Sequence, residues 1–196
     1  MSGYLDLTKK VLEEHNKVLL SVSEDEVEKL LDAIVASKNK SVFVWGIGRM
    51  QCSARAFTMR LMHMGFNAHV IYDTTCPNLS LGDLLIVNAA CTTIDYTIMQ
   101  FAKKIGCKIV AITANVNSRA SKLCDFTVNL KGQVHGGRSY EIASIQPMAS
   151  LFEQTIFTFE DIIIQLLMKK MRIKPEQMAK KHINVDGYMD FNIDEE

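Results

Sequence analysis

A short glycine-containing segment in the first third of the chain has the residue types that bind an anion. Gly46, Ile47, Gly48 and Arg49 follow an apolar run and precede a helical pattern. Glycine lets the backbone turn sharply towards a ligand, and free N–H groups at a helix start favour an anion. Arg49 adds a permanent positive charge suited to a phosphate or sugar oxygen. The residues also fit an ordinary strand-to-helix turn, and Gln51 stands where a dinucleotide-binding fingerprint has its third glycine.

A second candidate segment ends in Cys91, Thr92 and Thr93 and again lies between an apolar run and a helical pattern. The two threonine hydroxyls, next to helix N–H groups, could hold a phosphate or could form an ordinary N-cap, and both interpretations stay open. Cys91 could be a reactive thiolate, because a helix N-terminus lowers the pKa of a cysteine. Free cysteines in reduced proteins more often fill space as small apolar residues.

The composition excludes several classes of function. The chain has 22 basic and 22 acidic residues, so no general positive field would hold a nucleic acid, and any anion must be bound locally. The five cysteines are widely spaced and contain no C-x-x-C pair, which argues against a disulfide framework and a zinc site. We find neither a signal peptide nor an apolar run long enough to span a membrane. We therefore expect a cytoplasmic protein with no nucleic-acid or membrane partner.

Five short β-rich runs, separated by helical patterns, predict the sheet that positions these segments. They cover residues 41–45, 67–72, 83–88, 108–113 and 126–130. This alternation predicts an α/β protein with a parallel sheet and helices on both faces, a three-layer αβα doubly wound fold. Loops at the carboxyl ends of such strands are the usual place for a ligand.

We expect a single domain over residues 1–196. Its N-terminal helices would lie within 1–38, its βα core within 40–130, and a long C-terminal helix and tail within 146–183. Residues 131–137 contain three glycines and no periodicity, so we expect a flexible loop that could serve as a mobile lid.

Helices are predicted on both sides of the core. Residues 11–20 and 27–35 have amphipathic patterns, and Ser23 and Glu26 stand in the register of a capping box before the second. Pro147 should open the longest helix, which is apolar around most of its circumference up to about residue 171. Such a helix is either buried within the domain or lies in a subunit interface, and an oligomer is the more economical explanation.

Two longer motifs resemble a known family. The segment GIGRMQCSARAFTMRLMHMGFNAHVIYDTTCP, which begins at Gly46, resembles the GxGRSG...AxxFxMRLMHLGF segment of 6-phospho-3-hexuloisomerases, members of the sugar isomerase (SIS) family. The segment SIQPMASLFEQ resembles their SIQPMGSLFEQ motif, and the likeness continues to KKHINV near the chain end. The resemblance implies a five-stranded parallel sheet and a homodimer or homotetramer. It also implies isomerisation of D-arabino-3-hexulose 6-phosphate and fructose 6-phosphate, without a metal or organic cofactor.

The resemblance also implies roles for individual residues. Gly46, Gly48 and Arg49 would line the sugar-phosphate site, Glu153 would be the general base, and His182 would match a family histidine that reaches an active site. Moving a carbonyl from C3 to C2 through a cis-enediol requires a carboxylate or imidazole that transfers the proton. It also requires a donor for the developing enediolate oxygen.

Both catalytic candidates have a structural interpretation as well. Glu153 could cap a helix with Ser150, although a helix that starts at Pro147 would leave Glu153 in the second turn. A carboxylate inside an apolar helix needs a partner or a function. His182, in a lysine-bearing tail, could be a solvated surface residue, or in an oligomer the tail could complete the site of a neighbouring subunit.

The chain departs from the family where phosphate is bound. The family loop reads SGSGET, whereas residues 89–94 here read AACTTI, and Met50 and Gln51 replace the serine and glycine of GxGRSG. Two explanations remain open. Thr92 and Thr93 with backbone N–H groups could hold phosphate in a shifted arrangement and keep isomerase activity, which the retained Glu153 motif favours. Alternatively, the protein could be a non-catalytic sugar-phosphate-binding or regulatory SIS protein, or a structural partner of another enzyme, which the altered loop favours.

Overall fold

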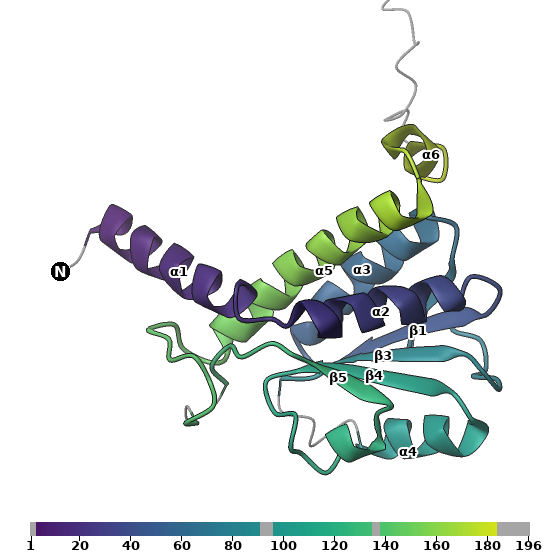
Figure 1. Cartoon of the computed structure of the whole chain (residues 1–196), viewed down its shortest axis with the longest axis horizontal. Helices are drawn as coiled ribbons and strands as arrows, with labels where there is room; N and C mark the ends of the chain where they lie inside the picture. Colours follow the sequence, from purple (N-terminus) through teal and green to yellow (C-terminus); the bar gives the residue numbers. More distant parts are fainter. Residues whose placement is uncertain (1–2, 91–95, 135–137, 184–196) are drawn as a thin grey trace, which may run out of the picture.

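Five parallel strands form one sheet in the order β2-β1-β3-β4-β5 (Figure 1). The computed structural model describes residues 3–90, 96–134 and 138–183. The strands are β1 (Ser41–Gly46), β2 (Asn67–Val70), β3 (Leu84–Asn88), β4 (Lys108–Thr113) and β5 (Phe126–Asn129). All five predicted strands are confirmed with boundaries shifted by no more than two residues.

Helices cover both faces of this sheet, as predicted. The helices α2 (Glu24–Ala36), α3 (Met50–His63) and α5 (Ser150–Met171) lie on one face, and α4 (Tyr96–Ile105) lies on the other (Figure 1). Within β1, Val42 and Val44 pack in the core with α2, α3 and α5, whereas Phe43 and Trp45 pack in the core with α4. Because successive strand residues point to opposite faces, one apolar run supplies both cores.

The first helix, α1 (Tyr4–Leu19), extends away from the sheet and contacts α5 (Figure 1). It begins seven residues before the predicted Val11. The amphipathic pattern marks only the part that meets α5, where Glu14 and Val18 are buried. Three leucines of α1 are exposed, namely Leu5, Leu7 and Leu12. A short 3-10 helix, Ser121–Leu123, precedes β5, and α6 (Pro175–Ala179) follows α5.

The predicted capping box of α2 does not form. The helix does begin directly after Ser23, but the Ser23 side chain makes no capping hydrogen bond. Glu26 instead accepts a hydrogen bond from the backbone N–H of Asn129, at 2.9 Å, where β5 ends. The carboxylate therefore links α2 to the end of the last strand, where it gives the Asn129 N–H group a hydrogen-bond partner.

The long helix α5 begins at Ser150, so the prediction that Pro147 opens it is wrong. Met148 and Ala149 have φ values of 59° and 62°, in the left-handed region, and such residues cannot belong to a right-handed helix. Glu153 consequently lies in the first turn of α5 and not in the second.

The described part of the predicted lid is packed against the domain. Val134 is buried, and a Cβ on Gly132 would lie 2.9 Å from the Cα of Phe152. Residues 135–137 lie outside the described residues, and a lid at this point stays a prediction. In the part of the chain that the structure describes, no helix is long and apolar enough to cross a membrane.

Candidate active site

The candidate site lies where the chain order of the sheet reverses. After β1 the chain passes outward to β2 and then returns to β3 on the other side of β1. The last residues of β1 and β3, Gly46 and Asn88, are register partners in the sheet. Ligands of open α/β sheets bind at such a switch point, outside the carboxyl ends of the strands.

Gly46 and Gly48 are required at this turn for different reasons. A Cβ on Gly46 would lie 2.6 Å from both the carbonyl carbon and the oxygen of Met50, so the first turn of α3 leaves no room for a side chain. Gly48 has open space around it but a φ of 59°, which favours glycine.

The expectation of free N–H groups at the start of α3 is wrong for its first residues. Met50 N–H donates to the Ile47 carbonyl at 3.2 Å, and Gln51 N–H donates to the Gly48 carbonyl at 3.0 Å. The Gln51 side chain also accepts a hydrogen bond from Gly46 N–H at 3.2 Å. In the sequence Gln51 is only a departure from two glycine motifs, whereas in the structure its side chain stabilises the turn.

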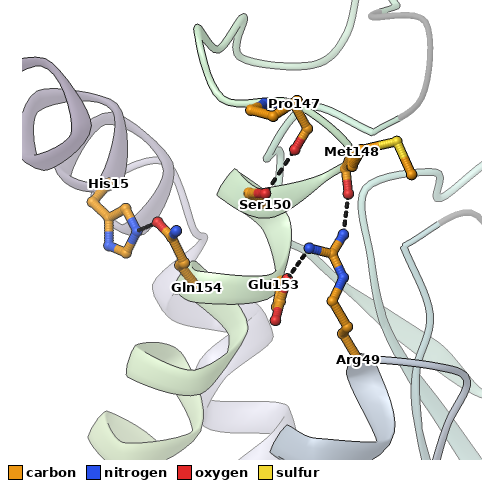
Figure 2. Close-up of polar contacts among 7 residues, drawn as sticks. All are labelled: His15, Arg49, Pro147, Met148, Ser150, Glu153 and Gln154. Carbon is orange, nitrogen blue, oxygen red and sulfur yellow. Dashed lines mark hydrogen bonds and ion pairs between the residues drawn. The ribbon is translucent and has the colours of Figure 1, made fainter. Parts of the chain in front are cut away.

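Arg49 and Glu153, which are far apart in the sequence, form an ion pair at this edge (Figure 2). The Nη1 atom of Arg49 lies 2.6 Å from Oε2 of Glu153, and Nη2 donates to the backbone carbonyl of Met148. The Arg49 side chain is 48% exposed and that of Glu153 is 24% exposed, so solvent and a ligand can reach both. The structure thus brings together the predicted anion-binding arginine and the predicted base.

The turn before α5 orients Glu153. Its N–H donates to the Ala149 carbonyl at 3.1 Å, while the Ser150 hydroxyl donates to the Pro147 carbonyl at 2.6 Å (Figure 2). Ser150 therefore bonds to the preceding turn and does not form a capping pair with Glu153. The Glu153 carboxylate instead pairs with Arg49, so the interpretation of Glu153 as a helix cap is not supported.

The helix α1 supports the segment that leads into Glu153. Glu14 accepts hydrogen bonds from the Ser144 hydroxyl at 2.7 Å, the Ile145 N–H at 2.8 Å and the Gln146 side chain at 3.1 Å. The next residue of α1, His15, has its Nε2 atom 2.8 Å from Oε1 of Gln154 (Figure 2). Glu14 was not among the residues predicted to support the site. The signal was available, since Glu14 stands on the apolar face of its helix, between Val11 and Val18.

The environment of Glu14 predicts a loss of stability in acid. Burial by itself raises the pKa of Glu14, but the hydrogen bonds from Ser144, Ile145 and Gln146 outweigh it, so that its pKa lies below the ordinary 4.5. A lowered pKa means that Glu14 stabilises the fold above about pH 4.5 and that this contribution is lost as the pH falls towards the folded-state pKa.

We therefore expect Glu14→Gln to lower the free energy of unfolding at pH 7 by about 1–3 kcal/mol, because charge-assisted hydrogen bonds are lost. Urea unfolding at pH 7 and at pH 4 measures this, and the difference from wild type should shrink in acid. Glu13→Gln is the matched control, since Glu13 is an exposed neighbour paired with Lys17. Equal stability of the two variants at pH 7 would contradict the assignment.

His182 lies away from this pair within the chain. It follows α6, beyond the far end of α5, which has 22 residues and is therefore about 33 Å long. Its ring centroid lies 5.1 Å from that of His63. A role for His182 in the Arg49–Glu153 site would thus require a second copy of the chain, and this stays a prediction.

The remaining predicted site residues, Cys91, Thr92 and Thr93, lie outside the described residues. The phosphate cradle predicted there is therefore still a prediction. The described chain leads up to it through Asn88, which is buried at the end of β3, and Ala89, which is buried as well.

The described site offers a guanidinium group that can bind anionic or polarised oxygens and a carboxylate that can accept and return a proton. No metal is needed for these two operations, and proton transfer next to a carbonyl is the chemistry they suit.

Comparison with known proteins gives relatives over most of the chain. A protein of Bacillus subtilis named 3-hexulose-6-phosphate isomerase is 34% identical over 90% of this chain and 96% of its own length. The 3-hexulose-6-phosphate isomerase of Methanocaldococcus jannaschii is 30% identical over 83% of this chain and 85% of its own length. A solved structure from Methanococcus jannaschii, for which the function of 3-hexulose-6-phosphate isomerase has been inferred, has a TM-score of 0.76 and 28% identity over 92% of this chain and 98% of that chain. No protein-family model matches the chain.

Proposed function

The chain belongs to the sugar isomerase (SIS) family of phosphosugar isomerases, and from this premise we propose that it interconverts a 3-hexulose 6-phosphate and fructose 6-phosphate, or a related ketose phosphate. The observation that carries the proposal is the ion pair between Arg49 and Glu153 at the carboxyl edge of the sheet. The named relatives support the substrate pair, and the two side chains supply the groups that such an isomerisation needs.

Glu153 transfers the proton between carbons. In the direction from fructose 6-phosphate, its carboxylate takes the proton from C3, and the electron pair moves through the new C2–C3 double bond onto the C2 oxygen. Protonation of that oxygen gives the enediol. Loss of the proton from the C3 hydroxyl and return of the carbon proton to C2 then give the 3-hexulose. General acid–base catalysis of this kind contributes roughly 10²–10⁴ in rate.

Arg49 has two functions in this mechanism. It stabilises the negative charge that develops on the enediolate oxygen, and it orients the sugar by hydrogen bonds to its oxygens. Because Arg49 already contacts Glu153 at 2.6 Å, a substrate oxygen bound to the same guanidinium is held next to the carboxylate.

The phosphate group binds at the loop after β3. Thr92 and Thr93 donate hydroxyl and backbone hydrogen bonds, and Cys91 lies beside them in place of a family serine. The Gly46–Gly48 turn on the neighbouring strand lets the sugar approach the backbone, and its position next to Asn88 in the sheet supports this arrangement.

The protein acts as a homodimer or homotetramer in which His182 of one copy assists Glu153 of another. Exposed apolar side chains on two helices support assembly, namely Leu5, Leu7 and Leu12 of α1 and Phe157 and Ile162 of α5. The separation of His182 from Glu153 along α5 supports sharing of the site between copies.

A mixing experiment tests this shared site. We expect Glu153→Gln and His182→Ala to lose most activity separately, and a refolded equal mixture to regain about a quarter of the wild-type sites, because one in four pairs combines an intact Glu153 with an intact His182. Activity is measured as isomerase turnover of the mixture against each variant alone. No recovery, or a fully active His182→Ala variant, would contradict the assignment.

The proposed reaction is tested by NMR of fructose 6-phosphate in D2O with purified wild-type protein. Enzyme-dependent exchange of the C3 proton, with formation of the 3-hexulose, is the expected result. Saturable binding without exchange would instead assign a non-catalytic sugar-phosphate-binding protein, and the absence of binding would leave a structural role.

A further inference from the structure

Three polar side chains are buried together beneath the candidate site. The Asn88 side-chain nitrogen donates to Oε1 of Glu160 at 2.6 Å and lies 3.0 Å from the Ser53 hydroxyl. Asn88 and Ser53 have no exposed surface, and Glu160 is 2% exposed. We call this set the buried cluster. Buried polar groups are costly unless they are paired, so its presence in an apolar core requires a reason.

Each member of the buried cluster is close in the chain or the sheet to a residue of the site. Ser53 lies one turn after Arg49 in α3, and Asn88 is the register partner of Gly46. Glu160 lies seven residues after Glu153 in α5, which places it on the same face of the helix and about 10 Å along its axis. The buried cluster therefore joins the three elements whose relative positions decide whether Arg49 meets Glu153.

Two oxygen atoms of the cluster show which protonation state fits. Among the described residues, Oε2 of Glu160 and Oδ1 of Asn88 are buried and accept no hydrogen bond. If Glu160 were ionised, both would be acceptors facing no donor. A proton on Oε2 turns it into a donor, and a carboxylic acid and a primary amide can then pair reciprocally, each donating one hydrogen bond to the other.

We propose that Glu160 is protonated in the active protein and pairs reciprocally with Asn88, and that this pair is a latch that positions Glu153 against Arg49. The latch acts through Glu153, so it rests on the proposed function. Glu160 is a positioning residue and does not touch the substrate.

The surroundings of Glu160 agree with a neutral carboxyl group. Burial raises its pKa to about 8, and the hydrogen bonds from Asn88 and Ser53 only partly oppose this. The nearby charge on its own helix, Asp161, makes a smaller contribution to the same rise in pKa, and Asp161 is paired with Arg60 of α3 at 2.8 Å.

Among the described residues of α1 and α2, which also pack on α5, no buried side chain brings a positive charge to Glu160. The buried residues of α2 are apolar, namely Leu30, Leu31, Ala33 and Ile34, and the one buried charge of α1, Glu14, is held by residues 144–146.

The latch predicts a pH dependence of stability with a definite sign. Below about pH 4.5 Glu160 is neutral in both the folded and the unfolded chain. Between about pH 4.5 and about 8 the folded chain keeps a proton that the unfolded chain releases, so stability falls as the pH rises. Above about pH 8 Glu160 is ionised in both states and the dependence ends, with a buried charge that disrupts the latch.

Two substitutions distinguish the effect of ionisation at Glu160 from the effect of losing its hydrogen bonds, namely Glu160→Gln and Glu160→Leu. Glutamine keeps one acceptor and one donor without ionising, whereas leucine removes both. Urea titrations at several pH values measure the unfolding equilibrium constant of both proteins. We expect the ratio of the wild-type constant to that of Glu160→Gln to increase with pH between pH 5 and pH 8, by at most about tenfold per pH unit. Asp161→Asn, which removes the neighbouring carboxylate, should keep the wild-type trend. The same trend in Glu160→Gln as in wild type would overturn a protonated Glu160.

Turnover tests the positioning role. We expect wild-type kcat on fructose 6-phosphate to decline around pH 8, Glu160→Gln to lack this decline, and Glu160→Leu to lose about tenfold or more in kcat with little change in KM. A Glu160→Leu variant with wild-type kcat would overturn the positioning role.

The latch can be tested even if the proposed reaction is wrong. If wild type does not turn over fructose 6-phosphate, the NMR signals of the Arg49 guanidinium report the Arg49–Glu153 contact instead. They should shift in Glu160→Leu and stay in place in Glu160→Gln. Unchanged signals in both variants would overturn the latch, while the stability measurements would still decide the protonation of Glu160.

Discussion

Replacing Glu153 by glutamine is expected to lower kcat for exchange of the C3 proton of fructose 6-phosphate by about 10²–10⁴-fold, with KM changed by only a few fold. The amide keeps the size of the side chain and can still contact Arg49, but it cannot take the proton from carbon. We expect substrate binding to be retained, because the substitution leaves Arg49 and the proposed phosphate loop unchanged. The measurement is the NMR exchange rate in D2O at saturating substrate.

Glu28→Gln is the matched control for this variant. Glu28 is another carboxylate held by α5, since it pairs with Lys170 at 2.7 Å, but it is exposed and lies in α2. We expect its turnover to equal that of wild type. If Glu153→Gln retains most of the wild-type turnover, Glu153 is not the base. If both variants lose activity, the loss comes from disturbance of α5.

Replacing Gly46 by alanine is expected to have the largest effect of any single methyl group in the site. The added Cβ would lie 2.6 Å from the Met50 carbonyl carbon and oxygen and 3.0 Å from the Gln51 nitrogen. These are backbone atoms, so the start of α3 must move and Arg49 moves with it. Overpacking of this kind costs about 1–3 kcal/mol, and a displacement of about 1 Å at a catalytic group can cost about 10²-fold in rate.

Urea unfolding and kcat/KM of Gly46→Ala measure the two effects. Gly48→Ala is the stability control, because Gly48 has open space and only its φ of 59° opposes a side chain, at roughly 1–2 kcal/mol. Gly46→Ala should lose both stability and turnover. A Gly46→Ala variant with wild-type stability would show that the turn can accommodate a side chain and that steric exclusion does not fix Gly46.

The sheet could be predicted because its signal is local. Each strand is a short apolar run, and an alternation of strands and helices restricts the sheet to a parallel one. Helix boundaries were predicted less well. The start of α5 was wrong because Pro147 suits both a helix start and a turn, and the left-handed Met148 and Ala149 decided between them. The capping box was wrong because Glu26 has a better partner in Asn129, which is distant in sequence.

The site could be predicted in part. Gly46, Gly48, Arg49 and Glu153 were identified from turn chemistry and from motif resemblance, and the structure places them at one edge of the sheet. The roles of Gln51 and Glu14 were not predicted: Gln51 was recognised only as a departure from glycine motifs, and Glu14 was missed although it stands on the apolar face of its helix. Their partners, Gly46 N–H and residues 144–146, are backbone or loop groups that carry no sequence signal.

The sequence by itself determined the parallel α/β class, the glycine-containing turn that carries the positive charge of Arg49, and the presence of a carboxylate in a helix that is otherwise apolar. These depend on local periodicity, glycine geometry and side-chain charge, which act over a few residues. Only the tertiary structure decided that Arg49 pairs with Glu153, that His182 lies at the far end of α5 and that Glu160 is buried against Asn88. Such contacts join residues 70 or more positions apart or depend on where helices end, so they follow from packing and not from any local pattern.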